Sequence, residues 1–231
     1  MKTTVLLPDR KSTAWGFGYM LFEFLAMPYL VIFLFGLLEL PLDPGWLNLL
    51  QYAVNFAVLA IIFWRFLRDS VRHAIKNIST VLLAALICYF AYQLSSTLVS
   101  IVTFAVFPDF SNVNDVNIES MAVDNFAMWA FATVVLVPPA EELLFRGVLF
   151  GGLYPHSKIA AWVLSVLGFA LIHVVGYIDL YPLELLALCL LQYLPAGICL
   201  AASYRFSGNI LTPILIHAVL NALAMLSMAT M

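Results

Sequence analysis

The chain has 231 residues, of which 64% are hydrophobic and only 10% are charged. Soluble domains average roughly 45–50% apolar and 25% charged residues, so this composition nearly excludes a soluble globular domain. It predicts an all-α, polytopic membrane protein embedded in the lipid bilayer. The net charge is −3 and no Lys- and Arg-rich patch interleaves with aromatic residues, so nucleic-acid binding is set aside.

Seven apolar runs, each separated by polar residues, predict about seven membrane-spanning helices. The first run follows Lys11, is longer than the apolar core of a signal peptide and lacks a cleavage pattern, so we expect it to stay in the mature protein. No hydrophilic stretch is long enough for a separate domain, and we expect residues 1–231 to form one membrane domain. The expected spans are 14–38, 46–66, 79–107, 125–153, 159–177, 183–203 and 209–229.

Basic residues predict the orientation of these spans. With a cytoplasmic N-terminus, the basic residues outside the spans all lie on the cytoplasmic side, which is the asymmetry that the positive-inside rule describes. They are Lys2, Arg10, Lys11, Arg65, Arg68, Arg72, Lys76, Lys158 and Arg205. We therefore expect a multi-pass protein of the cell membrane, with residues 108–120 as its longest external loop.

Ionisable side chains inside a membrane are costly and usually mark a functional site. The densest group follows Pro138-Pro139, where a helix should start or kink. Glu142 and Arg146 are four residues apart and can form an ion pair on one helix face, whereas Glu141 is rotated about 100° away and is free for chemistry. Alternatively, both glutamates pair with Arg146, or the trio lies in the membrane interface.

Two further pairs have the same four-residue spacing. Phe169 and His173 share one face of the fifth span, and His217 and Asn221 share one face of the seventh. Taken alone, His173 is explained by a core histidine bonded to a carbonyl, and the second pair by polar contacts between helices.

Depth along the helices brings the three groups together. At 1.5 Å per residue, Glu141, His173 and His217 lie about 18, 21 and 12 Å from the cytoplasmic ends of their spans. All three can therefore meet near the middle of the membrane.

A carboxylate, two imidazoles and a carboxamide, with no Ser, Cys or Thr in an obvious nucleophile motif, favour hydrolysis by activated water. Glu141 could accept the water proton, and His173 could orient the water or share that proton. His217 and Asn221 could donate hydrogen bonds to the oxyanion of a tetrahedral intermediate.

These residues also carry a resemblance to a known family. The motifs Glu141-Glu142-xxx-Arg146, Phe169-xxx-His173 and His217-xxx-Asn221, in this order on successive apolar helices, resemble those of the CAAX prenyl protease and bacteriocin-processing family of intramembrane glutamic-type endopeptidases. The resemblance covers residues 125–225, the expected catalytic core. It implies a helical bundle with a catalytic cavity open to the cytoplasm, the roles given above, and stabilisation of the site by Glu142 and Arg146.

The resemblance leaves the substrate open. Eukaryotic members trim the last three residues after a prenylated cysteine, whereas many short bacterial relatives are associated with peptide maturation, bacteriocin immunity or membrane-protein processing. The minimal loops of this chain favour the second group. We expect a membrane-embedded or lipidated peptide or protein substrate, possible prenylation included, and no cofactor.

Two alternatives stay open. The two glutamates and two histidines could bind Zn²⁺ in a metalloprotease, although no HExxH motif is present and Arg146 would disfavour a nearby cation. A non-catalytic transporter or scaffold could instead use the polar cluster to bind an ion or a partner helix. The cysteines Cys88, Cys189 and Cys199 lie in apolar runs without a CxxC motif and predict neither disulfides nor a zinc finger.

Glu23, within the first span, fits none of these motifs. It could face the cavity, bond across the bundle or mark an oligomer contact, and Pro28 is positioned to bend its helix. The nearby aromatic stripe is expected to face lipid or pack rather than to bind substrate; it comprises Phe17, Tyr19, Phe22 and Phe24.

Overall fold

The computed structural model describes residues 5–39 and 43–230, so the predicted cytoplasmic Lys2 lies outside the described residues. The described part is helical, without strands. Its α-helices are α1 (Arg10–Leu25), α2 (Met27–Leu37), α3 (Pro44–Ile62), α4 (Trp64–Lys76), α5 (Ile78–Val106), α6 (Val113–Asp124), α7 (Phe126–Phe131), α8 (Val137–Glu142), α9 (Lys158–Ile172), α10 (Leu183–Ser207) and α11 (Leu211–Met228). Two π-helices, η1 (Ala132–Leu136) and η2 (Leu143–Gly151), and the 3₁₀-helix η3 (Val175–Tyr177) complete it. The predicted all-α bundle is confirmed.

Each of the seven expected spans corresponds to a helical segment. Five are long and apolar enough to cross a membrane: Gly45–Ile62 in α3, α5, the continuous stretch Phe126–Gly151, α10 and α11. The first expected span is the pair α1 and α2, which bend by 59° at Ala26, close to Pro28, and which would make a sixth. The expected fifth span is α9, which has 15 residues and is shorter than the roughly 20 that a bilayer requires.

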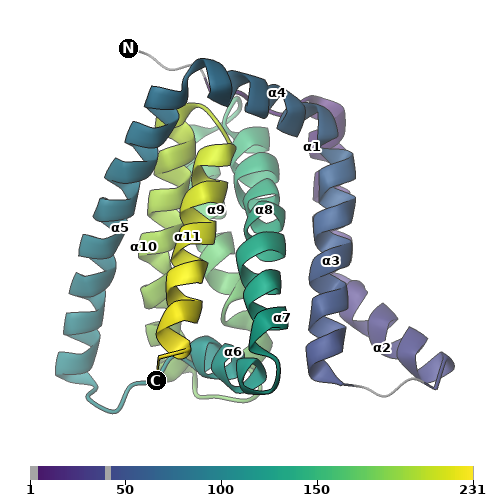
Figure 1. Ribbon diagram of the computed structural model, residues 1–231, viewed down its shortest axis with the longest axis vertical. Coiled ribbons are helices and arrows are strands. Elements are labelled where there is room, and N and C mark those ends of the chain that lie inside the picture. Colours follow the sequence, from purple (N-terminus) through teal and green to yellow (C-terminus); the bar gives the residue numbers. More distant parts are fainter. Residues whose placement is uncertain (1–4, 40–42, 231) are drawn as a thin grey trace.

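The basic residues gather at one end of the bundle. In Figure 1, α4 lies across the top of the bundle near the N-terminus, whereas α6 and the C-terminus lie at the bottom. Helix α4 is amphipathic: Phe66, Ser70 and Ala74 are buried beneath it, and its arginines are exposed. The amide Nδ2 of Asn209 donates to the backbone oxygen of Ser70 at 2.8 Å, which ties the start of α11 to α4. This is the arrangement of a helix lying in a membrane interface.

The main hydrophobic core fills the α4 end of the bundle. It includes the fully buried Phe63, Phe150 and Tyr204. The segment before α1 closes over this core, because the Leu6 backbone N–H donates to the oxygen of Gly208 at 2.9 Å and the Tyr204 hydroxyl donates to the oxygen of Leu6 at 2.5 Å. Helix α1 then starts at Arg10 and is capped by Asp9, whose carboxylate accepts hydrogen bonds from the first turn. The α4 end is therefore tightly packed.

The polar segment expected as an external loop is partly helical. Asn112 caps α6 by accepting a hydrogen bond from the backbone N–H of Asn114 at 3.1 Å, and α6 then runs to Asp124. The polar composition of this segment predicted a loop. Its structure depends instead on this cap and on contacts with α10, which are described below.

The stretch from Phe126 to Gly151 is helical throughout but changes its hydrogen-bonding pattern twice. Helix α8, which contains Pro138 and Pro139, lies between the π-helices η1 and η2. A helix start or kink was expected at the prolines, but the helix runs on through them, and only its hydrogen-bonding pattern changes, from π to α, at Val137. Wide π-turns are uncommon and occur frequently at functional sites.

Candidate active site

Arg146 is fully buried and pairs with Glu142, as the four-residue spacing predicts. Nη1 donates to Glu142 Oε1 at 3.1 Å, and Nε lies 3.1 Å from Oε2 but is not aligned for a hydrogen bond. Nη2 donates to the backbone oxygen of Gly197 at 3.0 Å, and the guanidinium carbon lies 4.6 Å from the centre of the Phe169 ring. Because the cation has a carboxylate, a carbonyl and a ring around it, its burial is compensated.

Gly197 allows α10 to approach α9 closely. A Cβ at this position would lie 3.1 Å from the backbone oxygen of Val166 and 3.4 Å from its Cα, and backbone atoms cannot give way as a flexible side chain would. The close approach therefore depends on glycine, and it keeps the Gly197 carbonyl within reach of Arg146.

His217 is bonded to the same carboxylate. Its Nδ1 lies 2.9 Å from Glu142 Oε1. Because an ionised carboxylate only accepts hydrogen bonds, Nδ1 carries the proton, and in the neutral ring Nε2 is then an acceptor. Nε2 lies 4.0 Å from Glu141 Oε2. The sequence paired His217 with Asn221, and the contact with Glu142 was not predicted because the two residues are 75 positions apart.

Glu141 lies next to Glu142 in the chain but faces the cavity described below, whereas Glu142 does not line it. Its Oε2 is buried and has no hydrogen-bond partner within the described part of the chain. A buried polar atom without a partner is uncommon and calls for an explanation such as an ordered water or a catalytic role. The predicted division between one paired and one free carboxylate is therefore present.

His173 directly follows the last residue of α9, as its C-cap, and lines the cavity. Its Nδ1 lies 2.8 Å from the backbone oxygen of Phe169, so Nδ1 donates and Nε2 is an acceptor. The Tyr193 ring stacks on the imidazole with centres 4.1 Å apart. His173 thus makes the hydrogen bond to a backbone carbonyl that is typical of a core histidine, but it also contributes to the cavity wall.

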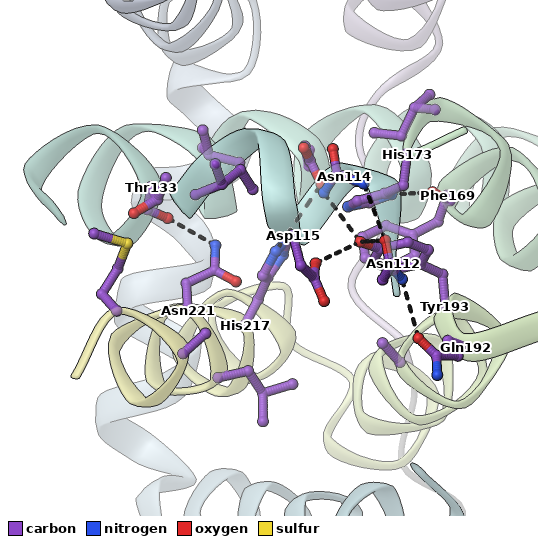
Figure 2. Close-up of a pocket in the computed structure, with 18 of the residues that line it drawn as sticks. Asn112, Asn114, Asp115, Thr133, Phe169, His173, Gln192, Tyr193, His217 and Asn221 are labelled. Atoms are coloured by element: carbon purple, nitrogen blue, oxygen red, sulfur yellow. Dashed lines mark hydrogen bonds and ion pairs between the residues drawn. The ribbon is translucent and has the colours of Figure 1, made fainter. Parts of the chain in front are cut away.

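Asn221 lies one turn after His217 on α11, and both line the cavity. Its Nδ2 donates to the backbone oxygen of Thr133, in η1, at 2.7 Å, as Figure 2 shows. An amide nitrogen has two N–H groups. This bond fixes the carboxamide and accounts for one of them.

The cavity has a volume of about 860 Å³ and extends from these residues to α6. Figure 2 shows a polar group on its α6 side that the sequence did not identify. The Tyr193 hydroxyl donates to Asp115 Oδ1 at 2.8 Å, Asn114 Nδ2 donates to that hydroxyl at 3.0 Å, and Asn112 Nδ2 donates to Gln192 Oε1 at 3.1 Å. Gln192 and Tyr193 lie within an apolar run. They were not predicted, because the prediction rested on acidic, basic and histidine side chains within the expected spans.

Glu23 lines the cavity and is bonded across the bundle, which joins two of its three expected roles. Its Oε1 accepts hydrogen bonds from Gln51 Nε2 at 3.0 Å and Asn55 Nδ2 at 2.5 Å. The single hydroxyl proton of Tyr19 has two acceptors within reach, Glu23 Oε2 at 3.3 Å and Asn55 Oδ1. Gln51 and Asn55 are four residues apart, so the spacing used for the other motifs could have identified them. Tyr19 is a polar partner here. Of the other stripe residues, Phe17 and Phe22 are 48% and 39% exposed, as a lipid-facing surface requires, whereas Phe24, 42% exposed, also lines the cavity.

Within residues 5–39 and 43–230, no group of three or more His, Cys, Asp and Glu side chains is placed to hold a metal ion together. Some of the possible ligand atoms are already bonded to protein groups. Glu142 Oε1 already accepts from Arg146 and His217, and the Nδ1 atoms of both histidines are bonded to protein oxygens.

Part of the chain matches a model of a known protein family. Residues 123–223, somewhat less than half of the chain, match the family model described as type II CAAX prenyl endopeptidase Rce1-like. No curated protein and no solved structure matches the chain. The matched residues contain all three motifs identified in the sequence.

Proposed function

We propose that this chain is an intramembrane glutamic-type endopeptidase, because its residues 123–223 match the model of the Rce1-like type II CAAX prenyl endopeptidases, a protease family. Its apolar helices make it an integral multi-pass membrane protein, which we place in the cell membrane. The substrate is a membrane-embedded or lipidated peptide or protein, with prenylation as one form of lipid. The reaction is hydrolysis of a peptide bond by a water molecule that Glu141 activates.

The observation that carries this proposal is the unpartnered Oε2 of Glu141. A buried carboxylate oxygen at the wall of a cavity accepts a hydrogen bond from any water that enters. The carboxylate can then take the proton while the water oxygen attacks the peptide carbonyl. No protein nucleophile is needed, in agreement with the absence of a Ser, Cys or Thr nucleophile motif in the sequence.

His173 is suited to orient the same water. With Nδ1 committed to the carbonyl of Phe169, its Nε2 offers a lone pair that accepts the second water hydrogen. The Tyr193 ring stacked on the imidazole fixes the plane of that lone pair. A water held by two acceptors directs its own lone pair toward a third point, where the substrate carbonyl carbon would lie.

The oxyanion is assigned to Asn221 and His217. Asn221 keeps one N–H after bonding Thr133, and this N–H is the donor in the resting site. His217 donates from Nε2 only when its ring carries a second proton, because Nδ1–H already serves Glu142. Glu141 Oε2 is 4.0 Å from Nε2, so this gap must close by about 1 Å before the proton taken from water can pass to His217 and convert Nε2 into a second donor to the oxyanion. Collapse of the intermediate breaks the C–N bond, and that proton leaves on the amine.

Metal-independent hydrolysis distinguishes this mechanism from a zinc protease. Activity should survive dialysis against a strong chelator, and the purified protein should contain no stoichiometric zinc. Loss of activity on chelation, with recovery on adding Zn²⁺, would assign the water to a metal instead.

The decisive experiment compares Glu141→Gln with a matched change at Glu184, which is exposed at the start of α10 and does not line the cavity. Purified variants in proteoliposomes are given a farnesylated CAAX peptide and a panel of transmembrane-segment peptides, with cleavage read by mass spectrometry. We expect Glu141→Gln to lose about 10²–10⁴-fold in rate and Glu184→Gln to match the wild type. Unchanged turnover in a folded Glu141→Gln protein would refute the assignment, and proton- or ion-coupled flux without cleavage would favour a transporter.

A further inference from the structure

The two ends of the bundle differ in charge and in whether they give access to the cavity. Outside the site, every described Lys and Arg lies at the α4 end of the bundle, and the described residues at the α6 end include no Lys or Arg. The basic residues are Arg10, Lys11, Arg65, Arg68, Arg72, Lys76, Lys158 and Arg205. Because positive loops stay on the cytoplasmic side, the α4 end is the cytoplasmic one.

The cavity does not reach the cytoplasmic end. On that side its wall stops at Leu144, Phe145, Leu200 and His217, none of which is more than 5% exposed. Beyond them lies the packed core that the segment around Leu6 closes. A peptide approaching from the cytoplasm would meet close-packed side chains rather than a passage.

The cavity is open at the opposite end. The lining residues there include Ser111, Asp115 and Glu119, at and beside α6, and Ser227 near the end of α11, all of them exposed. In Figure 1 these elements lie at the bottom, away from α4. The polar mouth of the cavity and the cationic end of the bundle are therefore on opposite faces of the membrane.

We infer that the cavity opens to the extracytoplasmic face, and that its substrates are exported peptides or the extracytoplasmic ends of membrane proteins. The substrate class rests on the proposed peptidase activity, whereas the direction of the opening does not. This direction is opposite to the cytoplasm-facing cavity that the family resemblance implies. Prenylated tails on the cytoplasmic leaflet would not reach Glu141 without crossing the bilayer.

Cysteine labelling tests the direction without requiring activity. Cys88, Cys189 and Cys199 are replaced by Ala, and single cysteines are introduced as Glu119→Cys at the cavity mouth or Arg72→Cys on α4. Intact cells are treated with a membrane-impermeant maleimide. We expect at least tenfold more labelling of Glu119→Cys than of Arg72→Cys, and equal labelling after permeabilisation. Labelling of Arg72→Cys in intact cells, with Glu119→Cys protected, would overturn the inference.

A second reporter and a cleavage assay complete the test. Ser227→Cys, which lies on another helix at the same mouth, should label like Glu119→Cys, so the result does not depend on one variant folding. Sealed vesicles of known orientation then receive a farnesylated CAAX peptide coupled to dextran, which cannot cross the membrane. We expect Glu141-dependent cleavage only in right-side-out vesicles. Cleavage only in inside-out vesicles would overturn the extracytoplasmic location of the substrate but would support the peptidase activity. No cleavage in either vesicle type, together with the expected labelling, would refute the peptidase activity and leave the direction of the opening supported.

Discussion

Replacing Arg146 with Met should destabilise the protein by about 3–5 kcal/mol. Met keeps an unbranched apolar chain beside Phe169 but removes the donors to Glu142 and Gly197. A hydrogen bond to a charged group contributes about 1.5–3 kcal/mol, and here the change also leaves the fully buried Glu142 carboxylate without its cation. The loss should therefore exceed that of either hydrogen bond alone.

The double variant Arg146→Met/Glu142→Gln separates these contributions. A neutral amide tolerates burial without a cation and still offers an oxygen to His217, so the double variant should be more stable than the two single losses predict when added. We expect a coupling energy of at least about 1 kcal/mol, since residues in one ion-pair network couple by about 0.5–3 kcal/mol. The measurement is reversible unfolding in mixed micelles. Additivity within about 0.5 kcal/mol, or a loss below about 1 kcal/mol for Arg146→Met alone, would refute the reasoning.

Four further outcomes are expected. Gly16→Ala should cost about 1–3 kcal/mol, because the new methyl would lie 2.6 Å from two core side chains, whereas Gly18→Ala, with no atom within 4 Å, should be neutral in the same unfolding assay. Tyr193→Phe keeps the stacking on His173 and should lower the cleavage rate less than Tyr193→Leu, which removes it. A peptide with a C-terminal amide should be cleaved faster than the same peptide with a free carboxylate, because four carboxylates and, within the described residues, no Lys or Arg line the cavity; equal rates would contradict this. Hydrogen bonds at the start of α1 hold the pKa of Asp9 below its usual value. Wild type should therefore be more stable than Asp9→Ala by about 1 kcal/mol above pH 4, and this difference should be lost as pH falls through the lowered pKa.

The sequence predicted the elements of the bundle well because the signal for a membrane span is local. A run of apolar residues can be recognised without knowing which residues pack against it, and each of the seven runs is helical in the structure. The prediction was less accurate at two helices: α9 is shorter than a full membrane span, and α6 lies where a loop was expected. Helix α6 depends on the cap at Asn112 and on bonds to Gln192 and Tyr193, which are about 80 residues away in the chain.

At the site, contacts within one helix were predictable because they too depend only on residues close together in the sequence. The pair Glu142 and Arg146 follows from spacing alone, and the structure confirms it. The bond from His217 to Glu142 joins α11 to α8, and no spacing rule connects residues 75 positions apart. The cluster around Glu23 has the same origin, since Tyr19 and Glu23 come from α1 but Gln51 and Asn55 come from α3.

This unpredicted bond gives Glu142 and Arg146 a positioning role in the proposed mechanism. The Gly197 carbonyl holds Arg146, Arg146 holds Glu142, and Glu142 fixes Nδ1–H of His217, so that the imidazole presents Nε2 to Glu141. A base must be held in one tautomer and one orientation to exchange a proton with its neighbour, and a buried carboxylate commonly provides that restraint. The ion pair thus does more than make a buried arginine tolerable, because loss of either partner would also release the ring whose second nitrogen lies 4.0 Å from the proposed base.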